Sequence, residues 1–178
     1  MHDTLAASQV PSAVFAEHSG GPEDVRPHIA HRGALCDALA YWEALRGRRR
    51  FPARAEFDPM ALRRHLPVIY LLEAAPDGEF RYRVVGGMIS EFFGAVSPVG
   101  RTPQEVFGEN AEIALAPYRL VCARRCLYMH RASAAWLYRN RAYVHYNVLL
   151  LPMGTDEARV DKILAAVDFI SEEAARRA

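Results

Sequence analysis

The sequence has little lysine, few cysteines and no long apolar run, and each shortage disfavours a class of protein. Lys162 is the only lysine among 178 residues, so arginine carries nearly all of the positive charge. The 22 basic side chains are almost balanced by 21 acidic ones, which leaves a net charge of +1. Such a balance is unusual for a protein that holds nucleic acid by charge. No segment approaches the roughly 18 consecutive apolar residues of a membrane span.

The three cysteines and the N-terminal residues both indicate the cytoplasm. An odd number of cysteines, in a chain long enough to build its own core, is typical of reduced thiols. The first residues lack the basic-then-apolar order of a secretory signal peptide, so none is expected. We expect one domain over residues 30–171, a flexible N-terminal tail over 1–29 with a short helix near 12–17, and a C-terminal tail over 172–178.

A β-hairpin is the clearest local signal. Residues 68–72 form a β-branched and apolar run, and Pro76 and Gly78 then supply the chemistry of a tight turn. Along residues 80–85, large side chains such as Tyr82 alternate with arginines. This period of two predicts a half-buried antiparallel return strand.

Helix signals lie on both sides of the hairpin. Leu35, Leu39, Trp42 and Leu45 fall at helical spacing and predict an N-terminal amphipathic helix that ends at Gly47. Proline and capping residues predict further helices at 60–66 after Asp58, at 88–93 before Gly94, from the capping box at Thr102, and at 117–129.

Three strands are predicted after the helices, at residues 132–138, 142–151 and 160–170, the first two joined by a turn at 139–141. The predicted fold is therefore α+β: a five-stranded curved antiparallel sheet with helices between its second and third strands. A ferredoxin-like repeat needs two strand–helix–strand units, which the chain lacks. The helical block inside the strand order also disfavours a cone-shaped fold with its helices first.

The order of elements and four segments together resemble a PAS domain, in particular short stand-alone bacterial PAS-like proteins of largely unassigned role. The segments are YWEALRG at 41–47 with FPAR at 51–54, FDP at 57–59, FRYRVVG at 80–86 through FFG at 92–94, and LLLP at 149–152. The resemblance implies a sensory module that binds a small ligand or a protein, usually as a dimer. It implies no catalytic residues.

Candidate ligand-binding side chains come from the return strand, the long predicted helix and the C-terminal strands. If alternate residues of the strand after 142 face the helices, they supply the polar lining that orients a small ligand. If they face outward, they form a surface for a protein partner, and sequence parity leaves both faces open. The candidates are Tyr82, Cys122, Arg125, Cys126, Trp136, Tyr143, His145 and Asn147.

Metal binding is disfavoured by distance. Cys122, Cys126 and His130 would share one face of the predicted helix, but the ends of that row are ~12 Å apart along the axis. One ion with bonds of ~2.0–2.3 Å cannot take all three, and buried cysteines commonly serve as small apolar side chains. We assign no metal site, and the cofactor stays open. Arg125 is either a rim residue or an anchor for an anion.

The arginines between residues 46 and 54 form the densest cluster of positive charge, and they support an alternative function, the binding of an anion or nucleic acid. A protein that binds an anion or nucleic acid would use guanidinium groups of this kind on phosphates, although the near-neutral net charge favours a solvated connector. The candidate anion-binding residues are Arg46, Arg48, Arg49, Arg50 and Arg54.

An enzyme is not expected, because no nucleophile lies in a recognisable pattern with a base and no phosphate-binding loop follows Gly86-Gly87. We expect a regulatory module that binds a small molecule or a regulatory protein. The wide apolar stripe of the Trp42 helix predicts a homodimer.

Overall fold

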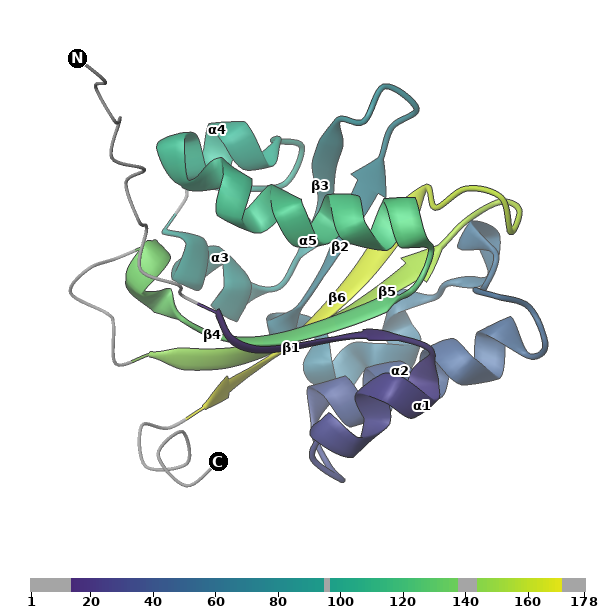
Figure 1. Ribbon diagram of the computed structural model, residues 1–178. Helices are drawn as coiled ribbons and strands as arrows, with labels where there is room; N and C mark the ends of the chain where they lie inside the picture. Colours follow the sequence, from purple (N-terminus) through teal and green to yellow (C-terminus); the bar gives the residue numbers. More distant parts are fainter. Residues whose placement is uncertain (1–13, 95–96, 138–143, 171–178) are drawn as a thin grey trace, which may run out of the picture.

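A single antiparallel sheet forms the centre of the molecule, and helices cover both of its faces (Figure 1). The computed structural model describes residues 14–94, 97–137 and 144–170. The strand order is β1-β4-β5-β6-β2-β3. The strands are β1 (Val14–Gly20), β2 (Ile69–Ala74), β3 (Phe80–Val85), β4 (Leu127–Ser133), β5 (His145–Met153) and β6 (Lys162–Ile170).

The helices before β2 and those after β3 cover opposite faces of this sheet (Figure 1). The first group is α1 (Pro22–Val25), η1 (Arg26–His28), α2 (Ala34–Arg46), η2 (Arg54–Glu56) and η3 (Pro59–Val68). The second is α3 (Gly87–Phe93), α4 (Pro103–Phe107), η4 (Gly108–Asn110) and α5 (Ala111–Arg124), and η5 (Ala134–Trp136) follows β4. No helix in the described ranges is both long and apolar enough to cross a membrane.

Strand alternation divides the side chains between the two helical layers. On β5 and β6, Val148 and Val167 are register partners and line the space beneath α3 and α5. The next residue on β6, Asp168, lies under Gly33 at the start of α2 instead. Both faces are therefore buried over the centre of the sheet, which explains why β5 and β6 read as nearly continuous apolar runs.

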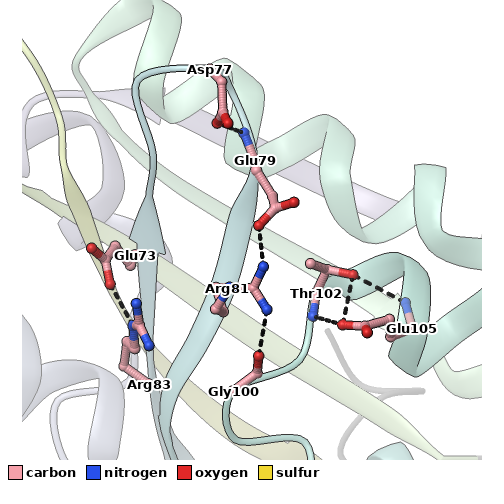
Figure 2. Close-up of polar contacts among 8 residues, drawn as sticks. All are labelled: Glu73, Asp77, Glu79, Arg81, Arg83, Gly100, Thr102 and Glu105. Carbon is pink, nitrogen blue, oxygen red and sulfur yellow. Dashed lines mark hydrogen bonds and ion pairs between the residues drawn. The ribbon is translucent and has the colours of Figure 1, made fainter.

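The predicted hairpin and caps are confirmed. β2 pairs with β3, and Thr102 forms the capping box of α4: its hydroxyl accepts from the backbone N–H of Glu105, and its own N–H donates to the Glu105 carboxylate at 2.7 Å (Figure 2). The arginines of β3 point away from the cavity side. Arg83 pairs with Glu73 on β2, and Arg81 pairs with Glu79 and donates to the carbonyl of Gly100 (Figure 2).

The fold differs from the prediction in having a sixth strand. Residues 14–20, expected to belong to a flexible tail with a short helix, instead form β1, which pairs with β4 along its length. The strand was hard to predict because its burial pattern is mostly exposed and gives no clean period of two. Its stability comes from the edge of β4, which lies over a hundred residues later in the chain.

The long helix and the strand after it also differ from the prediction. α5 begins at Ala111 and contains Pro117 in its interior, and it ends where Arg125 adopts a left-handed conformation with φ of 53°. Residues expected to continue the helix to 129 form the first part of β4 instead, paired on both sides with β1 and β5. Pairing on two edges satisfies the backbone of this segment as fully as a helix does, so tertiary context overrides local preference.

The elements after the start of β4 also have other bounds than predicted. The strand predicted at 132–138 ends at Ser133 and gives way to η5, and the turn predicted at 139–141 lies outside the described residues. β6 begins at Lys162, two residues later than predicted, and ends at Ile170 as expected.

Candidate functional site

An apolar cavity of about 320 Å³ lies between the sheet and the helices α3, α4 and α5. Its volume is at the lower end of the range for small-molecule sites. Aliphatic side chains from α3, α5, β5 and β6 contribute, but aromatic rings dominate the wall. These are Tyr70, Phe92, Phe93, Phe107, Tyr118, Tyr128, Trp136 and Tyr146.

Three buried tyrosines form a chain of hydroxyl groups at the β2–β3 side of the cavity. The Tyr118 hydroxyl from α5 lies 3.0 Å from that of Tyr70 and 3.3 Å from that of Tyr82. Burial raises the pKa of each of these phenols well above its ordinary value. They therefore stay protonated, and their mutual hydrogen bonds leave this wall nearly apolar toward the cavity.

A second polar pair lies beside η5. The indole N–H of Trp136 donates to the hydroxyl oxygen of Tyr146 at 2.6 Å, and burial raises the pKa of Tyr146 to about 12. Trp136 also packs edge-on against Phe107, with ring centroids 5.2 Å apart. η5 and α4 are thereby held together on this side of the cavity.

The polar edge of the cavity is built by β1 and β4. Tyr128 donates its hydroxyl proton to the carboxylate of Glu17 at 2.7 Å. His130 is the register partner of Glu17, and its Nδ1 is buried with no hydrogen-bond partner among the described residues. Burial lowers the pKa of His130 to about 4, although the charge of Glu17 opposes the shift. The imidazole is therefore neutral at physiological pH.

The mouth of the cavity lies between α5 and β1. Glu17 on β1 and Ala116 on α5 are both exposed and both line the cavity. Glu17 is the one charged side chain in this lining, and within the described part of the chain no lysine or arginine contributes to it. The arrangement suits an uncharged or cationic apolar molecule better than an anion.

The candidate ligand-binding residues divide between this cavity and the rest of the molecule. Trp136 lines the cavity, and Tyr82 supports its wall through Tyr118. His145 and Asn147 alternate with Tyr146 and Val148 on β5 and so face the other side of the sheet, where Asn147 accepts from Arg131 at 3.1 Å. Tyr143 lies outside the described residues.

The candidates near the end of α5 lie away from the cavity lining. Cys122 is half-buried, and burial raises its pKa to about 11. Arg125 donates to the carbonyl of Ala158, and Cys126 precedes β4. Because α5 ends before Cys126, the predicted helical row with His130 does not exist. No group of three or more metal-ligating side chains occurs among the residues that the structure describes.

Three of the five clustered arginines bind the protein's own backbone. Arg46 donates to the carbonyl of Arg49, Arg49 donates to those of Leu45 and Arg46 and pairs with Glu56, and Arg50 donates to those of Arg124 and Arg125 at the end of α5. Arg48 and Arg54 are exposed. This connector thus anchors α2 and α5, and anion binding there stays a prediction.

Sequence reasoning missed most of the polar groups of the cavity. Tyr128 and His130 were assigned to the end of a helix, and Glu17 to the tail. Tyr146 carried a usable signal, since it alternates with His145 and Asn147, but parity left the face undecided. Glu17, Tyr128 and His130 come together through the pairing of β1 with β4, and sequence periodicity does not reveal that pairing.

Comparison with known proteins settles the family. The PAS domain family matches residues 31–167, most of the chain. This chain belongs to the PAS domain family. The PAS domain here carries the additional strand β1 before the matched region. PAS domains are sensory or regulatory modules, and this one is such a module.

Individual relatives add little to the family assignment. One solved structure to which the chain is similar is described as "Structure of an RNA-binding Light-Oxygen-Voltage Receptor"; it is 17% identical, with a TM-score of 0.45. The match covers 71% of this chain and 37% of the receptor chain, so this chain spans less than half of that protein. No curated protein matches the sequence.

Proposed function

We propose that this PAS domain is a sensor that binds a small apolar molecule in the cavity under α3, α4 and α5. The observation that supports this best is the cavity itself: about 320 Å³ lined by aromatic rings between the sheet and the helices, where protein interiors are ordinarily close-packed. A void of this size forfeits packing contacts that aromatic side chains otherwise make. An apolar ligand restores those contacts and so stabilises the folded state.

The proposed output is non-covalent. α3, α4 and α5 close the cavity, so a bound molecule contacts them and the sheet at once. Filling the cavity would change how these helices pack and alter a surface offered to a regulatory protein. The proposal includes no catalytic step. It places the protein in the cytoplasm, in keeping with the three free cysteines.

A homodimer is part of the proposal, but not through the surface that the sequence suggested. The stripe of α2 packs against the sheet of its own chain, and the indole N–H of Trp42 donates to the carbonyl of Pro152 at 2.7 Å. A dimer therefore has to use another surface. Light scattering of the full chain over a range of concentrations tests it, and a monomer at all concentrations would exclude it.

A cavity-filling variant tests ligand binding directly. Ala132 is buried on β4 and lines the cavity, so Ala132→Phe places a ring inside it. Ala55→Phe, on the exposed η2, is the matched control. Native mass spectrometry of freshly purified protein, with thermal-shift screening of apolar compounds, should detect ligands with the wild type and the control. Equal binding by Ala132→Phe would contradict the cavity as the site.

A further inference from the structure

The unpaired Nδ1 of His130 is the one buried ring nitrogen without a hydrogen bond among the described residues. The imidazole that carries it is one of the side chains that line the cavity. A buried polar atom without a partner costs free energy, and most such atoms in native proteins are paired. The position of this one suggests that its partner comes from the occupant of the cavity.

The chemistry of a neutral imidazole decides what that partner is. A neutral histidine carries one N–H and one lone pair, so Nδ1 is either a donor or an acceptor. Orphaned buried N–H groups are rarer in native structures than acceptors with a free lone pair. With the proton on Nε2, Nδ1 is the acceptor and the occupant donates to it.

Tyr146 adds a donor on the neighbouring strand. Its ring meets that of His130 edge-on at 6.1 Å between centroids, and both line the cavity. The Tyr146 oxygen already accepts from Trp136, which leaves its own proton for an acceptor. A hydroxyl group both donates and accepts, so it complements the two side chains together.

The charge of the cavity lining further restricts the chemical class of the ligand. The Glu17 carboxylate at the mouth disfavours an anion, and among the described residues no lysine or arginine lines the cavity to balance one. The same carboxylate already accepts from Tyr128, which reduces its attraction for a cation. The surrounding rings favour a planar apolar body.

We propose that the cavity selects a neutral aromatic hydroxy compound whose hydroxyl group donates to Nδ1 of His130. This rests on the proposed function, because it specifies the chemical class of the ligand that the sensor binds.

The test uses naphthalene probes that share the ring system and differ in one substituent. Equilibrium dialysis of the full chain near pH 7.5 measures binding of naphthalene, 2-naphthol, 2-methoxynaphthalene, 2-naphthoate and 2-naphthylmethylamine. We expect 2-naphthol to bind about twofold to tenfold more tightly than naphthalene, the range for one neutral hydrogen bond. The methoxy compound can accept from Tyr146 but cannot donate to His130, so it should bind less tightly than 2-naphthol.

Variants assign that preference to one atom. His130→Leu should reduce the affinity of 2-naphthol to that of 2-methoxynaphthalene, because it removes the acceptor for the hydroxyl proton. His130→Asn places an amide oxygen near Nδ1 and should keep part of the preference. His31→Leu, an exposed histidine, is the matched control. If His130→Leu does not fold, the comparison of hydroxyl with methoxy in the wild type still tests the inference.

Each remaining outcome contradicts either the proposed ligand class or the proposed function. An equal ratio of 2-naphthol to 2-methoxynaphthalene affinity in the wild type and His130→Leu, or tightest binding of the carboxylate or the amine, would overturn the assignment of the ligand class and leave the cavity as a binding site. Binding of none of the five probes would contradict the proposed function as well.

Discussion

Acid should destabilise this protein through the buried ring of His130. The pKa of His130 is lowered from 6.5 to about 4 in the folded state, mainly by burial. Between these two values the unfolded chain binds a proton that the folded chain excludes. Stability is therefore complete above about pH 6.5, falls as the pH drops toward 4, and changes no further through this residue below that.

The magnitude follows from the size of the shift. One pKa unit corresponds to about 1.4 kcal/mol, so the full difference sets a ceiling of about 3 kcal/mol. The side chain keeps a partly exposed edge, which reduces the effect, and we expect a loss of about 2 kcal/mol between pH 7 and pH 4.5. The ionisable side chains that face the ring are Glu17 on β1, Tyr128 on β4 and Tyr146 on β5, and Tyr118 on α5 lines the same cavity.

Urea denaturation at the two pH values measures the loss. Carboxylates elsewhere titrate in the same window, so the informative quantity is the difference between wild type and His130→Asn, which carries no titrating ring. The variant should lose about 2 kcal/mol less than the wild type, and His31→Asn should behave as the wild type does. In a Glu17→Gln background the effect should grow, because the charge of Glu17 raises the pKa of His130. An equal pH dependence in wild type and His130→Asn would refute the reasoning.

Three further predictions concern positions where the structure gives a matched comparison. Gly86→Ala should destabilise the fold by at least about 2 kcal/mol, because the added methyl group overlaps the backbone of the residues before β2, whereas Gly87→Ala has open space and should be neutral or slightly stabilising by thermal denaturation. Trp42→Phe should cost about 1–3 kcal/mol in urea, since it leaves a buried carbonyl unpaired; a loss below 0.5 kcal/mol would show that water replaces the indole. Arg50→Ala should destabilise the chain by about 1–2 kcal/mol and Arg48→Ala by less than about 0.5, and a salt titration of RNA binding that Arg48→Ala flattens would instead revive the nucleic-acid alternative.

Local signals carried most of the fold. The turn chemistry at Pro76 and Gly78, the capping box at Thr102 and the apolar stripe of the Trp42 helix each act over a few residues, and each is found where it was predicted. The alternation along β3 also indicated correctly that its arginines face away from the core. From these elements in this order, the class of fold follows.

The cavity depends on long-range pairing instead. Tyr128 and His130 have no local signal that separates the end of a helix from the start of a strand, and β4 exists because β1 and β5 bind its two edges. The choice between Tyr146 and His145 as the inward residue of β5 is likewise fixed by register, since a shift of one residue exchanges the two faces of a strand.

The sequence by itself determined the order of helices and strands, because turns, caps and periodicity are set by neighbouring residues. Only the tertiary structure decided which side chains surround the cavity and that Nδ1 of His130 has no hydrogen-bond partner among the residues described. Burial and hydrogen-bond satisfaction depend on strands brought together from distant parts of the chain, and no local pattern records that.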